Sequence, residues 1–91
     1  MAEPANQANL PGLDFSTFIV SLATSAQLHL GIIEAPEGID FSPNKLEAKH
    51  TIDLLEILES KTKGNLTGDE EKLLGHLLYE LRMAFLEKKE A

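Results

Sequence analysis

The chain contains no cysteine, and this absence removes three kinds of chemistry at once. Disulfide bonds, thiolate metal sites and a cysteine nucleophile are all excluded. A domain of 91 residues that lacks a disulfide framework is also more typical of a reducing compartment than of the extracellular space. We therefore expect a cytoplasmic protein.

Positive charge is also scarce. Eight Lys and Arg residues stand against fifteen Asp and Glu residues, which gives a net charge of −7, and the basic residues form no cluster. Such a chain repels the phosphate backbone of a nucleic acid, and it repels an anionic membrane surface for the same reason. We expect neither a nucleic acid nor a membrane among its partners.

Formal charge is missing altogether from residues 15–33, which lie between Asp14 and Glu34. Nineteen residues are long enough to cross a membrane, but only eleven of these are apolar, and no Lys or Arg precedes them. Residues 1–12 likewise lack the basic start of a signal peptide. The segment is therefore expected to be a helix of a soluble protein, and its lack of charge indicates that both of its faces are covered.

The sequence pattern predicts an all-α protein. Helical periodicity and end signals predict three helices, at about 15–30, 43–63 and 68–88. They form a single domain over residues 13–91, and the polar residues 1–12 are expected to be a disordered tail. A chain this short buries only about 60–65% of its unfolded surface, so a monomer is expected to be marginally stable.

The first two helices have recognisable ends. Asp14 is a favourable N-cap for the first helix, and Gly31 suits the position that follows its last turn. Ser42 is expected to cap the second helix, with Pro43 as the first helical residue, where the missing N–H costs nothing.

A short connection joins the second and third helices. Gly64 is expected to stop the second helix, and Thr67 with Glu70 forms the pattern of a capping box at the start of the third. A connection of this length predicts that the two helices form an antiparallel hairpin.

Two helices carry uncharged residues on the side opposite their expected core face. Because two such stripes in one small domain are unusual, we expect a homo-oligomeric bundle, with a dimer favoured over larger assemblies; another protein is the alternative partner. Neutral Ser and Thr are also tolerated on a wet helix face, so a monomer stays a second interpretation. The predicted interface consists of Thr17, Val20, Ser21, Thr24, Leu28, Tyr79, Met83 and Leu86.

Three segments resemble a known family. They are FSTFIVSLATSAQLHLG at 15–31, KHTIDLLEILESKTKGNLT at 49–67 and EEKLLGHLLYELRM at 70–83. These strings are similar to a family of small bacterial proteins classed as domain of unknown function 1844. The resemblance covers about three quarters of the chain and implies a short, cytosolic, mainly helical bacterial protein. It implies no activity, cofactor or catalytic residue.

No arrangement of residues in the sequence predicts an active site. Glu47 and His50 have the Glu-x-x-His spacing of carboxylate-bridged di-iron bundles, but such sites need a second motif and two further glutamates. His29 and His76 lack a Glu three residues before them. We therefore expect no catalytic residue, no cofactor and a non-enzymatic interaction or assembly module in the bacterial cytoplasm. The alternative is a helical bundle that binds a metal or a small molecule through its His and Glu side chains.

Overall fold

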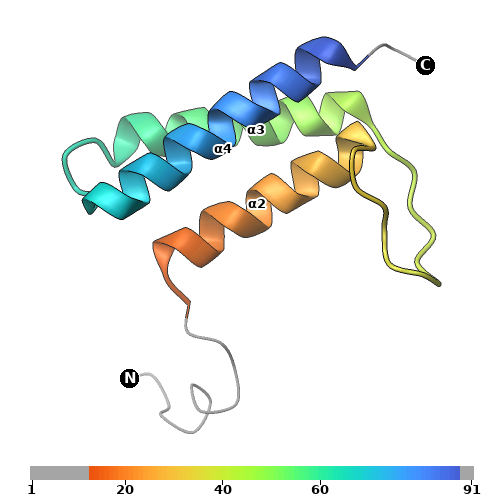
Figure 1. The fold of residues 1–91 in the computed structure, drawn as a ribbon, viewed down its shortest axis with the longest axis horizontal. Coiled ribbons are helices and arrows are strands. Elements are labelled where there is room, and N and C mark those ends of the chain that lie inside the picture. The colour runs from red at the N-terminus through yellow and green to blue at the C-terminus, as the bar shows by residue number, and fades with distance from the viewer. Residues whose placement is uncertain (1–12, 89–91) are drawn as a thin grey trace, which may run out of the picture.

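A computed structural model describes residues 13–88 of the protein, and the tail expected at 1–12 lies outside the described residues (Figure 1). Its helices are α2 (Phe15–Leu30), α3 (Lys45–Lys61) and α4 (Gly68–Glu87). No strand occurs within residues 13–88. The predicted all-α class with three helices is confirmed.

Both ends of α2 are formed as expected. The Asp14 carboxylate accepts the backbone N–H of Thr17 at 2.8 Å, and the pKa of Asp14 is lowered by this N–H and by the Thr17 side chain. At the other end, Gly31 adopts a left-handed backbone with φ of 75°. The N–H groups of Gly31 and Ile32 donate to the last turn at 3.0 and 3.2 Å, which is the Schellman pattern.

The predicted start of the second helix is wrong by two residues. Asn44 caps α3, because its side-chain oxygen accepts the N–H groups of both Leu46 and Glu47, at 2.9 and 3.2 Å. Asn is at least as good an N-cap as Ser, and one acceptor here serves two unpaired donors. Ser42 and Pro43 consequently lie before the helix rather than at its cap and first position.

The predicted end of this helix at residue 63 is also two residues late. Lys61 is the last residue of the helix, and both the N–H and the hydroxyl of the capping residue Thr62 donate to the carbonyl of Leu58, at 2.9 and 2.7 Å. A turn follows, in which the Asn65 N–H donates to the Thr62 carbonyl at 2.8 Å. Gly64 lies within this turn and has the positive φ, 86°, that favours glycine.

The capping box at the start of α4 is confirmed. The Glu70 N–H donates to the Thr67 hydroxyl at 3.1 Å, and the Thr67 N–H donates to the Glu70 carboxylate at 2.9 Å. Two N–H groups that the helix cannot use are therefore satisfied by this pair. The helix ends at Glu87, one residue before the predicted end.

Each helix contributes one narrow stripe to a shared core, and each contacts the other two. The buried positions recur every three or four residues, as expected for helices that bury one face. The buried residues are Ile19, Ala23, Ala26 and Leu30 on α2, Ala48, Thr51, Ile52 and Leu55 on α3, and Leu74, Leu78 and Leu81 on α4.

Contacts between α3 and α4 place the start of one helix beside the end of the other. The ammonium group of Lys45 donates to the Lys88 carbonyl at 2.6 Å and lies 4.4 Å from the centre of the Phe85 ring. Further along α3, the Arg82 guanidinium donates twice to one carboxylate oxygen of Glu56, at 3.0 and 2.9 Å. In Figure 1, α4 passes in front of α3, and α2 lies along the lower side of the pair.

The outer side of α3 carries apolar residues that neither α2 nor α4 covers. Apolar residues occupy most of its circumference, but Leu46 is 80% exposed and Ile57 is 55% exposed. Phe18 of α2 is likewise 43% exposed. Two neighbouring helices can cover only about half of a helix surface, so the remaining apolar residues face outward within this chain.

Candidate interaction surface

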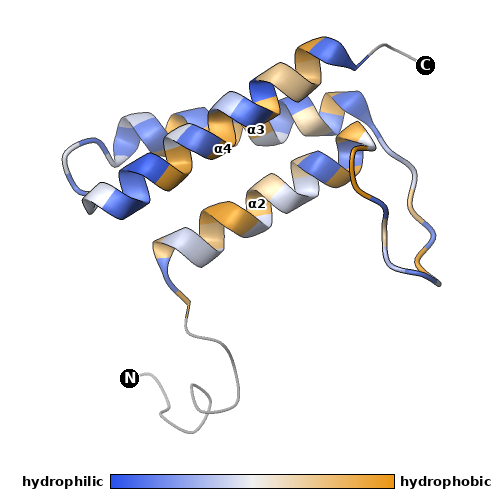
Figure 2. Ribbon diagram, viewed as in Figure 1, coloured by the Kyte–Doolittle hydropathy of each residue, from blue (hydrophilic) through white to orange (hydrophobic). Residues whose placement is uncertain are grey.

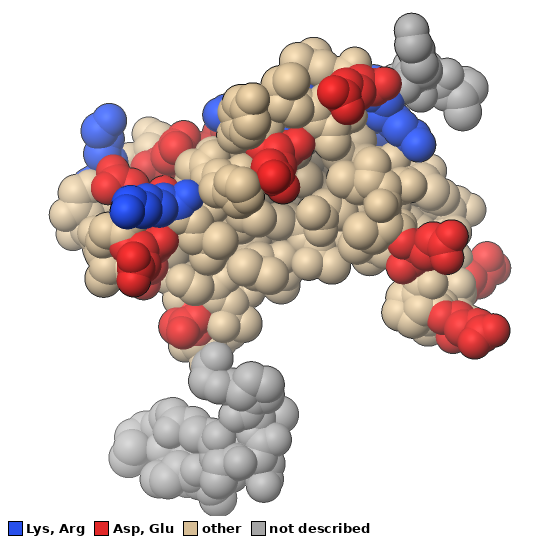
Figure 3. Space-filling model, viewed as in Figure 1, with Lys and Arg blue, Asp and Glu red and all other residues tan. Residues whose placement is uncertain are grey.

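The outer side of α2 forms an uncharged surface. Thr17, Ser21 and Thr24 are exposed, Val20 is 43% exposed, and Leu28 is partly buried. Figure 2 shows pale and orange residues along most of this helix, whereas blue residues are interspersed along α4. In the space-filling view, tan surface covers α2, and acidic side chains lie at its margins (Figure 3). The five predicted interface residues of α2 thus lie on a surface without charge.

Two hydroxyl groups on this surface already have partners. The Ser21 hydroxyl donates to the Phe18 carbonyl at 2.8 Å, and the Thr24 hydroxyl donates to the Val20 carbonyl at 2.9 Å. A hydroxyl that donates to its own helix backbone keeps this bond when water leaves. Burial of the face in a contact therefore avoids much of the cost of an unsatisfied polar group.

A groove lies between the last turns of α2 and the second half of α4. Its volume is about 400 Å³. Tyr79 and Met83 line it, and they are 63% and 41% exposed. The other lining residues are Gln27, Ile32, Glu80, Leu81, Ala84 and Glu87. Tyr79 and Met83 are therefore brought next to the uncharged helix, as a joint interface requires.

Leu86 is separated from the other predicted interface residues of α4. It is 76% exposed and lines a different hollow, of about 260 Å³, together with Lys49 and Arg82 from the two helices α3 and α4. Its helical position differs enough from that of Met83 to turn it toward α3. The predicted stripe of α4 is thus divided between two hollows.

Ile32 and Gln27 belong to the groove but were not among the predicted interface residues. Ile32 is 48% exposed, directly after the Gly31 turn that ends α2. The uncharged segment continues through this residue, and that continuity is the sequence signal that could have identified it.

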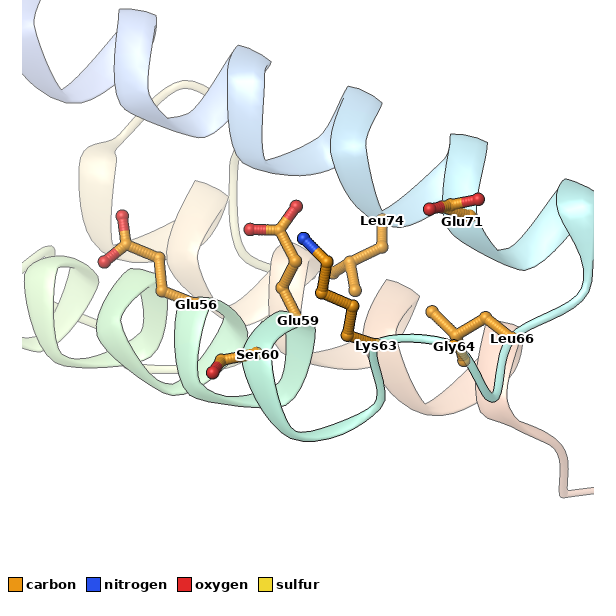
Figure 4. A pocket seen from close by; sticks show the side chains of 8 residues that line it. All are labelled: Glu56, Glu59, Ser60, Lys63, Gly64, Leu66, Glu71 and Leu74. Atoms are coloured by element: carbon orange, nitrogen blue, oxygen red, sulfur yellow. The ribbon is translucent and has the colours of Figure 1, made fainter.

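A third hollow, also of about 400 Å³, lies where α3 is followed by α4 (Figure 4). Carboxylates of Glu56, Glu59 and Glu71 line it, the Lys63 side chain points toward Glu59, and the buried Leu74 is also part of the lining. Glu56 is already paired with an arginine, as described above. The hollow is therefore an acidic surface depression without a set of groups that converge on one point.

The histidines lie apart from one another. His76 and Glu80 form an exposed pair one helical turn apart, with 3.3 Å between Nε2 and Oε2. Glu47 and His50, the weak metal candidates, are both exposed on α3. Within residues 13–88, no group of three or more His, Asp or Glu side chains is placed to hold a metal ion.

His29 lies against the loop that precedes α3. Its ring centre is 4.8 Å from that of Phe41, with the planes tilted by 48°. The buried Nδ1 atom has no hydrogen-bond partner among residues 13–88. The His29 ring therefore packs against this loop.

No helix within residues 13–88 combines the length and the apolar character that a membrane span requires.

The family described as "Domain of unknown function (DUF1844)" has a model that matches residues 12–87. No curated protein and no solved structure matches the chain. The match extends over all three helices, and so it includes the uncharged face of α2 and the groove between α2 and α4.

Proposed function

This chain belongs to the DUF1844 family, and we propose that it is a non-enzymatic helical module that assembles with further copies of itself. In this proposal α3 and α4 form an antiparallel hairpin, and α2 packs against it with its uncharged side facing outward. Assembly takes place in the bacterial cytoplasm, a setting that suits a chain without cysteine.

The observation that supports this proposal best is the uncharged face of α2 with its internally bonded hydroxyls. A helix face that remained in water would normally carry charged side chains. Here Ser21 and Thr24 direct their hydroxyl groups to the helix backbone, and Val20 adds exposed apolar surface. Small side chains also let two helices approach closely.

The groove beside α2 extends this surface. Tyr79 and Met83 are residue types that occur often in protein interfaces. A stable complex buries about 800 Å² on each partner, more than one helix face supplies. The proposed interface therefore combines the α2 face with the groove. A pair of copies related by a two-fold axis would use this same surface twice.

Light scattering at micromolar concentration tests the assembly directly. The chain has a mass of 10.0 kDa, so a dimer is expected at about twice that value. A particle with the mass of one chain at these concentrations contradicts the proposal.

Substitutions in α2 test the face. Ser21→Glu and Thr24→Lys each place a charge in the proposed dry contact and should weaken assembly. Ser21→Ala is the matched control: it removes only a hydroxyl that is bonded to its own helix, so assembly should persist. If both charged variants assemble like the wild type and melt at the same temperature, this face is in contact with water.

A further inference from the structure

A row of four residues follows the outer side of α3. Leu46 is 80% exposed and Ile57 is 55% exposed, and the exposed His50 and the partly exposed Asp53 lie between them on the same side. Since α3 has 3.6 residues per turn, these four positions fall within an arc of about 60°. The buried side of the helix, which includes Leu55, is opposite this arc.

The spacing of this row is that of a coiled-coil seam. Its four members, Leu46, His50, Asp53 and Ile57, are separated by four, three and four residues. Alternating steps of three and four keep successive side chains facing a partner helix. Within residues 13–88, α2 and α4 pack mainly on the opposite side of α3, and of this row only Asp53 borders α4, at the hollow that Phe85 and Leu86 also line.

We propose that α3 pairs in antiparallel orientation with α3 of a second copy of the chain. The two-fold axis then passes between His50 and Asp53. Leu46 packs against the partner subunit's Ile57 at both ends of the contact. His50 meets the partner's Asp53, again twice because of the symmetry.

Charge complementarity favours a second copy in this orientation. Each central layer pairs an imidazole with a carboxylate, and these polar groups fix the register of the two helices. The Asp53 carboxylate accepts the Lys49 ammonium at 3.0 Å within its own chain, and its further lone pairs can accept the imidazole N–H. A parallel pair would instead place His50 against the partner's His50 and Asp53 against the partner's Asp53, and the second of these contacts sets two carboxylates against each other. Two copies of α3 are thus complementary in charge only when they run in opposite directions.

This contact is independent of the proposed interface on α2, because it uses the side of α3 that faces away from the other two helices. Only its end layers are apolar, so the contact is expected to be weaker than the first. Both contacts together could join more than two copies, so the mass of the assembly alone does not identify the α3 contact. An assay that traps weak association at defined positions is therefore required.

Disulfide trapping provides that assay, since the chain has no cysteine of its own. Leu46→Cys and Ile57→Cys are introduced into one chain, which is then oxidised. The two positions are about 16 Å apart along one helix, too far for a bond within the chain, since a disulfide needs Cα atoms about 4.4–6.8 Å apart. In the antiparallel pair, position 46 of one copy lies beside position 57 of the other, and this contact occurs twice. Most of the protein should therefore become covalent dimer.

The single-cysteine variants are the matched controls. In the antiparallel pair, each copy of Leu46→Cys or Ile57→Cys lies about 16 Å along the axis from its counterpart, so neither should be trapped efficiently. Efficient trapping of a single variant would contradict the antiparallel orientation. Absence of trapping in the double variant would overturn the proposal, whatever light scattering shows for the wild type.

Exchange of the central pair tests its chemistry. His50→Asp alone creates two carboxylate pairs across the axis and should reduce trapping of the double-cysteine chain several-fold. Addition of Asp53→His restores opposite partners in the reversed order and should restore trapping. Equal trapping in all three backgrounds would show that these residues do not meet. Disruption of the α2 face by Ser21→Glu should leave the α3 trapping pattern in place, which separates this proposal from the first.

Discussion

Replacement of Gly64 by alanine should destabilise the protein through the backbone alone. Gly64 has a φ of 86° in the turn between α3 and α4, and a Cβ atom added there would have no atom of residues 13–88 within 4 Å, its two chain neighbours aside. Steric contact with the rest of the protein is therefore excluded as a cause. What remains is the cost of a left-handed backbone for a residue with a side chain, about 1 kcal/mol. For a domain of this size that corresponds to a loss of about 4–8 °C in melting temperature.

Gly75→Ala is the matched control with the opposite expected sign. Gly75 also has open space around the added Cβ, but it lies inside α4 and its φ is not positive. Alanine is favoured over glycine in a helix interior by about 1 kcal/mol, so this variant should melt at a higher temperature. The same chemical change thus stabilises at one position and destabilises at the other.

Circular dichroism melts and urea titrations of both variants at one protein concentration measure the difference. A total stability of about 5–10 kcal/mol makes a change of about 1 kcal/mol readily measurable. Gly64→Val should lower the melting temperature further, because a β-branched residue is less tolerated in this conformation. If Gly64→Ala is as stable as the wild type, the connection between α3 and α4 is not built around a left-handed glycine.

Three further changes test other parts of the fold. Thr67→Ala should cost about 1 kcal/mol of stability by removing a cap, whereas Thr67→Ser should retain most of it; urea titration distinguishes the two. Asp14→Asn should be close to neutral at pH 7, because Asn is also a good cap. Since the pKa of Asp14 is lowered in the fold, the wild type should lose this stabilisation as the pH falls from about 5 to about 2, while the Asp14→Asn variant should not. Melts across this range would show a constant difference between the two proteins if the cap is not formed. Leu55→Ala should cost about 2–5 kcal/mol, because the side chain is fully buried, and retention of a wild-type melt would mean that Leu55 is outside the core.

The sequence predicted helix ends well wherever the capping signal was unambiguous. Asp14, Gly31 and Thr67 act as expected, and Thr67 is distinguished from its neighbours Asn65 and Asp69 by the Glu three residues later that completes a capping box. The start of α3 offers Ser42 and Asn44 two residues apart, and the choice depends on which side chain reaches two backbone donors. The residue types alone do not show which of the two side chains reaches the backbone N–H groups.

Burial was predictable by face but not by extent. Helical spacing places Ile19 and Leu78 on the more apolar face of their helices, and both are buried. It could not show that Phe18 and Ile57 would stay exposed, because the number of helices that cover a face is a property of the whole fold. Apolar composition indicates that a helix face favours burial. Whether another helix of the same chain covers that face depends on how the helices are arranged.

The candidate interface was predictable in part for the same reason. Helical spacing places Val20 and Thr24 on one side of α2, and it places Tyr79 and Met83 together on α4. Which of these sets are neighbours depends on how the helices cross, and so does the separation of Leu86 from the rest.

The position of Tyr79 gives the groove a built-in optical probe. Tyr79 is the only tyrosine of the chain, and the chain has no tryptophan, so its ultraviolet fluorescence comes from one side chain. This ring is 63% exposed in the groove between α2 and α4. Any molecule that covers the groove must restrict the tumbling of the ring and shield it from collisional quenchers. Fluorescence anisotropy and acrylamide quenching of the unlabelled protein therefore report directly on whether this groove is occupied.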